Sequence, residues 1–197
     1  MILEALVLAI IGGYLLRGKL SNLAHLEWRW PLLFVFGMFW QRLPFLLADR
    51  WPVLVPALPW LYMSSYLLLL VAVAVNWHEP AFRLVGAGLL LNLLVIAVNG
   101  GHMPVSPEAV ARAGLPPLPE DPADYVSTPH VRMAADTKLW FLGDIVPVSI
   151  PYRPARVVSI GDVLLAVGIL WLVVRGMRTE GAGQVSNGAA PVETPRT

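Results

Sequence analysis

The apolar residues of this chain gather into five runs that are separated by polar connections. The runs cover about residues 2–20, 31–47, 57–77, 82–98 and 157–174. None has the two-sided arrangement of apolar and polar positions that is typical of helices on a soluble protein. A membrane-spanning helix needs roughly 20 mainly apolar residues. The pattern therefore predicts an all-α fold, a polytopic integral membrane bundle of about five transmembrane helices.

The first run does not have the pattern of a cleaved secretory signal. A signal begins with basic residues and ends in small residues at a cleavage site, whereas this run carries Glu4 near its start and Arg17 and Lys19 near its end. We expect an uncleaved helix that extends to Leu20, because long basic side chains reach the membrane surface from within the apolar layer.

Residues 99–156, between the fourth and fifth runs, form a Pro-rich stretch that we call the capping segment. Its prolines rule out one continuous helix through its first half. Ser106-Pro107-Glu108 predicts the start of a short helix that ends at Gly114. Residues 116–125 are expected to be extended and acidic. Residues 139–142 are apolar but too short to span, so we expect them at the membrane interface or dipping back toward the bilayer.

The last run begins at a recognisable helix start and ends before a polar tail. Ser159 is followed three residues later by Asp162, which is close to a capping box. Residues 179–197 are rich in Gly, Ala, Thr, Pro and Glu, and a stretch with so few apolar residues is expected to be disordered. We therefore divide the chain into one membrane domain, residues 1–178, and a disordered tail.

Composition agrees with a membrane location and excludes several classes of function. Hydrophobic residues make up 57% of the chain and charged residues only 14%, against about 25% charged in soluble domains. The net charge of +1 excludes a nucleic-acid partner, since binding phosphates needs a basic patch. The chain has no cysteine, which excludes disulfides, thiolate metal sites and cysteine nucleophiles.

The distribution of Lys and Arg predicts how the bundle is oriented. The side that holds the first connection and the C-terminal tail carries Arg17, Lys19, Arg29, Arg83, Arg175 and Arg178. The opposite side has Arg42 and Arg50 in its short connection, and the capping segment adds Arg112, Arg132, Lys138, Arg153 and Arg156. Long loops count for less in the positive-inside rule. With five spans, the bias predicts the N-terminus outside and the C-terminus inside.

The same five spans bring the polar residues of several helix ends to one mouth of the bundle. Ionisable groups at membrane depth are costly and usually paired, so they are candidates for function. Glu4 and Arg42 are the obvious pair, and Asn92 is expected to face the bundle interior with Asn99. The candidate ligand-binding residues are Glu4, Arg42, Asn99, His102, Asp144 and Asp162.

Each candidate also has a purely structural interpretation. The stretch Asn99-Gly100-Gly101-His102 resembles a loop that presents backbone amides to an anion, but Asn and Gly at this place equally form a helix C-cap. Asp162 is interpreted as a helix cap first and a catalytic acid second. His102 and His130, with Asp136 or Asp144, would suit a metal or an acid–base pair. No known metal-ligand spacing is present, and loop hydrogen bonds are the default interpretation.

Three stretches together carry a resemblance to a known family. They are Asn99 to Val105, Leu139 to Pro147 and Val158 to Leu164. The chain, over about residues 1–175, resembles a family of small bacterial multi-pass membrane proteins that carries a domain-of-unknown-function label. The resemblance implies the bacterial inner (plasma) membrane. It implies no activity, cofactor or catalytic residue.

Three functions are compatible with these features. The first is a binding protein in which the capping segment and the bundle mouth hold a lipid or another amphiphile, since apolar walls with a few convergent polar groups are typical of such sites. The second is a membrane-embedded enzyme acting on a lipid-linked substrate, and the third is an accessory subunit of a membrane complex. Apart from the bilayer itself, the expected partner is an amphiphilic ligand. The cofactor, if any, and the oligomeric state are left open.

Overall fold

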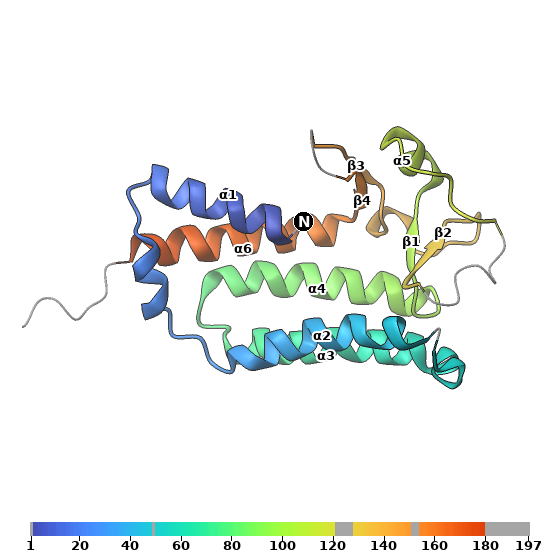
Figure 1. Ribbon diagram of the computed structural model, residues 1–197, viewed down its shortest axis with the longest axis horizontal. Helices are drawn as coiled ribbons and strands as arrows, with labels where there is room; N and C mark the ends of the chain where they lie inside the picture. Colours follow the sequence, from blue (N-terminus) through green and yellow to red (C-terminus); the bar gives the residue numbers. More distant parts are fainter. Residues whose placement is uncertain (1, 49, 121–127, 151–153, 180–197) are drawn as a thin grey trace, which may run out of the picture.

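The computed structural model describes residues 2–48, 50–120, 128–150 and 154–179. Within these ranges the chain is mostly helical, and its long helices lie side by side (Figure 1). The long helices are α1 (Ile2–Leu15), α2 (Pro31–Ala48), α3 (Leu58–Val75), α4 (Pro80–Val98) and α6 (Ile160–Arg178). The short 3-10 helices η1 (Leu20–His25) and η2 (Pro52–Ala57) precede α2 and α3.

Among the described residues, four helical stretches are long and apolar enough to cross a membrane, namely Pro31–Ala48, Pro52–Val75, Pro80–Val98 and Ile160–Arg178. The expectation of five spans is not confirmed, because α1 has only 14 residues. The helix ends where Arg17 adopts a left-handed φ of 61°. Gly18 then packs so closely on Met177 of α6 that a Cβ would come within 2.8 Å of the methionine side chain. The chain therefore turns before Leu20.

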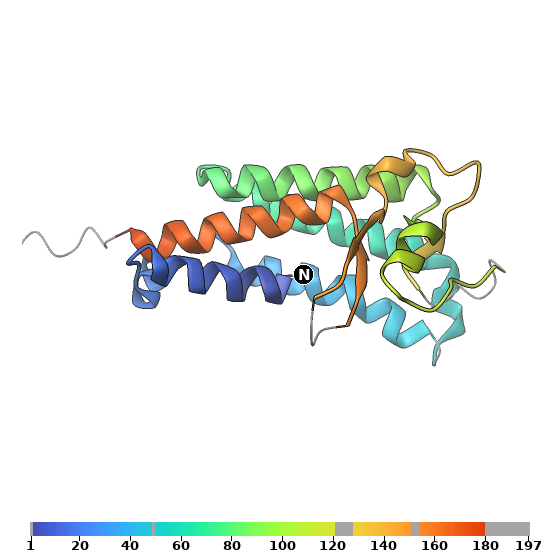
Figure 2. The same ribbon diagram turned by 90° about the horizontal axis from the view of Figure 1, so that it is seen from above.

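The bundle is built around α4 and α6. The helix α4 packs against α6 and α3, α3 packs against α2, and α1 lies along α6 (Figures 1 and 2). The main core lies between α3, α4 and α6, with Tyr66, Phe82 and Leu172 among its buried members. The pair α1 and α6 is shifted along the bundle axis relative to α2, α3 and α4, away from the capping segment (Figure 1).

Two glycines let α4 and α6 approach each other closely. A Cβ on Gly88 would stand 2.5 Å from the carbonyl oxygen of Gly161. A Cβ on Gly161 would in turn collide with the side chain of Asn92. The start of α6 therefore lies beside Asn92, six residues before Val98 ends α4, and not level with the end of that helix.

The capping segment covers the bundle end where α2 and α4 finish and where α3 starts (Figure 1). Its elements are β1 (Met103–Val105), α5 (Pro107–Arg112), β2 (His130–Arg132), η4 (Trp140–Leu142), β3 (Val146–Val148) and β4 (Arg156–Val158). The strands β1 and β2 pair in parallel, and β3 and β4 pair antiparallel. The prediction of a mostly helical fold is confirmed, and the short strands of the capping segment are an addition that was not predicted. Three-residue strands are too short to show an alternating pattern, and two of them contain a proline that disfavours a strand assignment.

Several local expectations for the capping segment and its flanks are confirmed. Ser106 caps α5 by accepting a hydrogen bond from the backbone N–H of Ala109, and Gly114, at φ 71°, follows its end. Ser159 and Asp162 form a complete capping box at the start of α6. The predicted acidic stretch at 116–125 lies partly outside the described residues, and the predicted disordered tail lies outside them from residue 180 onward.

The stretch at 139–142 is neither a span nor fully exposed. It contains the single 3-10 turn η4, in which Leu142 is buried in the main core. Trp140 and Phe141, by contrast, are 60% and 46% exposed. Leu139 also packs against this core. The stretch therefore attaches the capping segment to the bundle through two leucines and leaves two aromatic rings at the surface, an arrangement that fits an interfacial position.

Replacing Gly161 with alanine should destabilise the protein by about 1–3 kcal/mol, because the added methyl group forces α4 and α6 apart and disturbs Asn92. Gly12 is the matched control. It is also a helical glycine, but a Cβ there would lie 3.7 Å from Val174, an ordinary contact, so Gly12→Ala should not lower stability. Thermal unfolding of the purified variants in detergent measures both effects. Equal midpoints for the two variants would contradict the close contact of α4 with α6.

Candidate ligand site at the capped end of the bundle

A cavity of about 560 Å³ lies between α2, α3, α4 and α6, with one end at the capping segment. Most of its lining is apolar and includes Phe34, Met38, Leu89, Leu165 and Ile169. Its polar lining residues are Gln41, Arg42, Tyr62, Tyr66, His130, Asp144 and Asp162. The cavity thus combines a long apolar wall with a small group of polar side chains.

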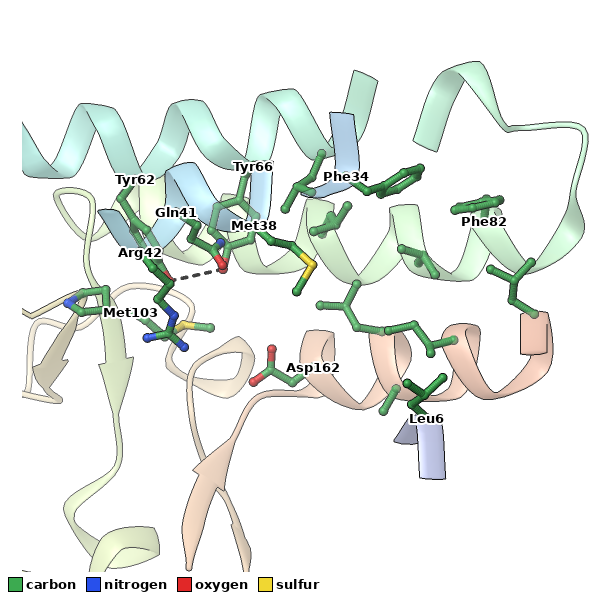
Figure 3. Close-up of a pocket in the computed structure, with 18 of the residues that line it drawn as sticks. Leu6, Phe34, Met38, Gln41, Arg42, Tyr62, Tyr66, Phe82, Met103 and Asp162 are labelled. Atoms are coloured by element: carbon green, nitrogen blue, oxygen red, sulfur yellow. Dashed lines mark hydrogen bonds between the residues drawn. The ribbon is translucent and has the colours of Figure 1, made fainter. Parts of the chain in front are cut away.

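The polar side chains gather toward one end of the cavity. In Figure 3, Arg42 reaches down from α2 into the space between Met103 and Asp162, while Phe34 and Phe82 stand at the opposite end. Phe34 and Phe82 are stacked there, with ring centroids 5.3 Å apart, and the ring of Trp28 meets both edge-on. The cavity therefore has a polar end at the capping segment and an end closed by aromatic rings.

Asp162 is held in place by a network that joins α6 to α4. Its Oδ1 accepts a hydrogen bond of 2.9 Å from Nδ2 of Asn92. The hydroxyl of Ser159 donates to Oδ1 of Asn92 at 2.9 Å and accepts from the backbone N–H of Asp162 at 2.9 Å. The interpretation of Asp162 as a helix cap is confirmed, and the same carboxylate also lines the cavity. Asn92 is buried and faces the bundle interior, as expected.

His130 and Asp144 are brought together by β1, which lies between their two segments. Met103 is paired with His130 in the parallel register of β1 and β2. On the other side of β1, the backbone N–H of Asp144 donates to the carbonyl of Pro104 at 2.8 Å, and the N–H of Ser106 donates to the carbonyl of Asp144 at 2.9 Å. His130 and Asp144 therefore flank one strand at the polar end of the cavity.

The carboxyl group of Asp144 is buried, and one of its oxygens lacks a hydrogen-bond donor in the described part of the chain. The residue is 5% exposed, and its Oδ1 has no hydrogen-bond partner among the described residues. Its Oδ2 stands 3.6 Å from Nε2 of His130, too far for a hydrogen bond. Burial raises the pKa of Asp144 to about 8, and the negative charge of Asp162 adds to the rise. The neutral acid is thus the form that this environment favours at pH 7.

His130 is neutral under the same conditions. Burial lowers the pKa of its imidazole below the usual value, and the positive charge of Arg42 lowers that pKa further. The polar end therefore holds one cation at Arg42, one carboxylate at Asp162, a protonated carboxyl at Asp144 and a neutral imidazole. Such a group can donate hydrogen bonds to a bound molecule, and it can exchange a proton with it.

Of the six candidate residues, Arg42, Asp144 and Asp162 line this cavity together. Glu4 has a different partner from the expected one. Its carboxylate accepts hydrogen bonds of 2.6 and 3.2 Å from the guanidinium of Arg156, whereas we expected a pair with Arg42. The reason is the small sheet of β3 and β4, which places Arg156 beside the start of α1.

Asn99 and His102 do not line the cavity. The side chain of Asn99 donates to the carbonyls of Val95 and Lys138, both at 2.8 Å, and accepts from the backbone N–H of Lys138 at 3.0 Å. Gly100 and Gly101 adopt left-handed φ values of 69° and 87°. The helix-cap interpretation of this stretch is confirmed. His102 is half-buried, and burial lowers its pKa.

Three comparisons place these features among known proteins. The model of a family of unknown function, DUF5317, matches residues 25–174. The chain belongs to the DUF5317 family. An uncharacterised protein of Thermotoga maritima is 26% identical to it over 170 residues, which cover 86% of this chain and 88% of that protein. No solved structure gives a significant match.

The region shared with the DUF5317 family contains most of the cavity. It includes every polar lining residue, from Gln41 to Asp162, and leaves out Leu6, which α1 contributes. Sequence reasoning weighed His130 only as one of several histidine options and did not identify Tyr62 and Tyr66. The two tyrosines are one helical turn apart on α3, with their hydroxyl oxygens 3.3 Å from each other. Their spacing within an apolar run is the signal that would have revealed them.

The raised pKa of Asp144 makes stability depend on pH with a definite sign. The unfolded carboxyl ionises near pH 4, while the folded one keeps its proton to about pH 8. Wild type therefore loses stability as pH rises between these values, and Asp144→Asn, which cannot ionise, does not share this loss. The melting temperatures of the two proteins should be similar near pH 4, with the variant increasingly higher up to pH 8. If the difference in melting temperature between wild type and Asp144→Asn were the same at every pH, the folded carboxyl group of Asp144 would not be neutral at pH 7.

Proposed function

We propose that this chain is an integral membrane protein that binds one lipid or similar amphiphile in the cavity. The observation that carries the proposal is the cavity itself, in which an apolar wall from four helices leads to Arg42, Asp144 and Asp162. An amphiphile has the same division into a long apolar part and a compact polar head. In the proposed complex the tail lies along α6 toward Phe82, and the head lies at the capping segment.

The size of the cavity supports a ligand with a single chain. Its volume of about 560 Å³ lies within the range of roughly 300–1,000 Å³ that is typical for sites enclosing one drug-sized molecule. A membrane lipid with two long chains needs more room than one such molecule. We therefore favour a fatty acid, an isoprenoid or another amphiphile with one tail.

The exposure of the lining residues supports entry from the bilayer. Tyr66 and Leu172, deep in the cavity, are 5% and 4% exposed, whereas Leu6 on α1 and Met38 on α2 are 37% and 46% exposed. The helix α2 packs mainly on α3, and α1 packs on α6. The rim of the cavity is thus formed by side chains of α1 and α2, on a face that would contact lipid tails rather than water.

We further propose that the protein lies in a bacterial inner membrane with the capping segment outside and the C-terminus inside. Helical spans support this location, because outer-membrane proteins cross as β-barrels. The orientation is supported by the basic residues at the uncapped end of the bundle, which are Arg17, Lys19, Arg83, Arg175 and Arg178.

Single-cysteine labelling tests the orientation without background, since the chain has no cysteine. In intact spheroplasts a membrane-impermeant maleimide should label Ser149→Cys in the capping segment. Thr179→Cys, at the end of α6, should be labelled only after the membrane is permeabilised. Both positions are exposed, so their reactivity in detergent should be equal. The reverse pattern in spheroplasts would contradict the proposed orientation.

Filling the cavity should remove the bound amphiphile. Ala166 lines the cavity, and Ala166→Trp should reduce the co-purified amphiphile per protein by on the order of tenfold, as measured by mass spectrometry after gentle detergent extraction. The neighbouring Val167 is 47% exposed and does not line the cavity, so Val167→Trp is the matched control and should leave the amount unchanged. Gel filtration and thermal unfolding verify the fold. Equal ligand in both folded variants would refute binding in this cavity.

A further inference from the structure

We propose that the head group of the bound amphiphile is an anion, a phosphate or a carboxylate, held by the guanidinium of Arg42 and by Asp144 acting as a protonated hydrogen-bond donor. This inference rests on the proposed amphiphile binding and adds the chemical class of the ligand. It is drawn from the partners and the burial of the groups at the polar end of the cavity.

Among the described residues that line the cavity, Arg42 is the cation that can receive an acidic head. In the described part of the chain, Arg132, Arg156 and Arg175 each form an ion pair with a glutamate. No such partner is found for Arg42 among the same residues, although its side chain points into the cavity (Figure 3). A guanidinium presents five N–H donors in a planar fork that matches a carboxylate or a phosphate.

The carboxylate of Asp162 is the group that could compete for Arg42, but each of its oxygens already accepts a hydrogen bond from the start of α6 or from α4. Its Oδ1 accepts from Asn92 and its Oδ2 accepts from the backbone N–H of Ser159. It also sits at the positive N-terminal end of α6, which stabilises a negative charge. Asp162 therefore serves the fold of α6, and the charge of Arg42 remains available.

Asp144 supplies the second contact. A buried carboxylate is disfavoured when one oxygen has no donor among the described residues and the other lies 3.6 Å from an imidazole nitrogen, so the group holds a proton. In that state it has an O–H donor, and its Oδ1 has no hydrogen-bond partner among the described residues, so this donor is available to a ligand. An acceptor-only head such as a phosphate or a carboxylate satisfies both Arg42 and Asp144. A cationic head would meet the positive charge of Arg42 and would gain no compensating negative charge from a neutral Asp144.

The groups around Asp144 determine how the affinity for an anionic head depends on pH. The titratable and charged groups that face Asp144 around the cavity are Arg42, His130, Asp162 and the hydroxyls of Tyr62 and Tyr66. The imidazole of His130 is already neutral at pH 7. When Asp144 ionises, near pH 8 in the empty protein, its carboxylate repels an anionic head. Affinity for the anion should therefore fall as the pH rises from 7 to 9.

The test compares four probes that share one tail and differ only in the head. They are dodecyl phosphate, dodecanoate, dodecanol and dodecyltrimethylammonium, titrated into the purified full chain in a nonionic detergent at pH 7, with binding followed by native mass spectrometry and thermal shift. At least one of the two anions should bind on the order of tenfold or more tightly than the alcohol. Which anion binds more tightly distinguishes a phosphate head from a carboxylate head. Tightest binding by the cation would overturn the proposal.

Three variants assign the contacts. Arg42→Gln should abolish the preference for the anion over the alcohol, whereas Arg50→Gln, which removes the same charge outside the cavity, should keep it. Asp144→Asn retains a donor and cannot ionise, so it should keep the preference and lose the dependence on pH. Loss of the preference in Asp144→Asn, or its persistence in Arg42→Gln, would refute the assignment.

The proposed function and this inference fail in different ways. If wild type binds the anion and the alcohol equally well, and Ala166→Trp binds neither, the proposed amphiphile binding is supported and the proposed anionic head group is overturned. Absence of binding by all four probes would overturn both proposals.

Discussion

The close contact of α6 with α4 determines where the polar groups of the cavity stand. Gly88 and Gly161 let the two backbones meet, and Asn92 then reaches both Ser159 and Asp162. This contact fixes the start of α6 at a level well inside the bundle. The capping segment must follow it inward, and a carboxylate is thereby held next to a long apolar wall.

The strand β1 performs the corresponding task for the capping segment. It follows the left-handed glycines that end α4, so its direction depends on the cap at Asn99. With β2 on one side and the Asp144 segment on the other, one three-residue strand places an imidazole and a carboxyl group beside the same cavity. The stretch that first suggested a ligand loop thus contributes by positioning its neighbours.

Local signals in the sequence predicted the parts of this structure that local physics controls. The apolar runs at 31–47 and 82–98 and the caps at Ser106, Asn99 and Ser159 are examples. The alternating direction of the predicted helices also placed Arg42 and Asp162 at the same end of the bundle, where both line the cavity. The remaining features depend on contacts between distant residues. The β3–β4 pair determines that Glu4 meets Arg156. The parallel pairing of β1 with β2 determines the place of His130, and the packing of Gly18 on Met177 determines the early end of α1. None of these leaves a local pattern.

The short α1 has a consequence for the order in which the bundle can form. It is too short to cross a membrane by itself, and its main partner is α6, the last helix in the described part of the chain. The turn after α1 is fastened to the same helix, because the backbone N–H of Lys19 and the side chain of Asn22 both donate to the carbonyl of Met177. Since α1 must wait for α6, this part of the bundle closes only after α6 has been synthesised. Leu6, at the rim of the cavity, takes its place in that final step.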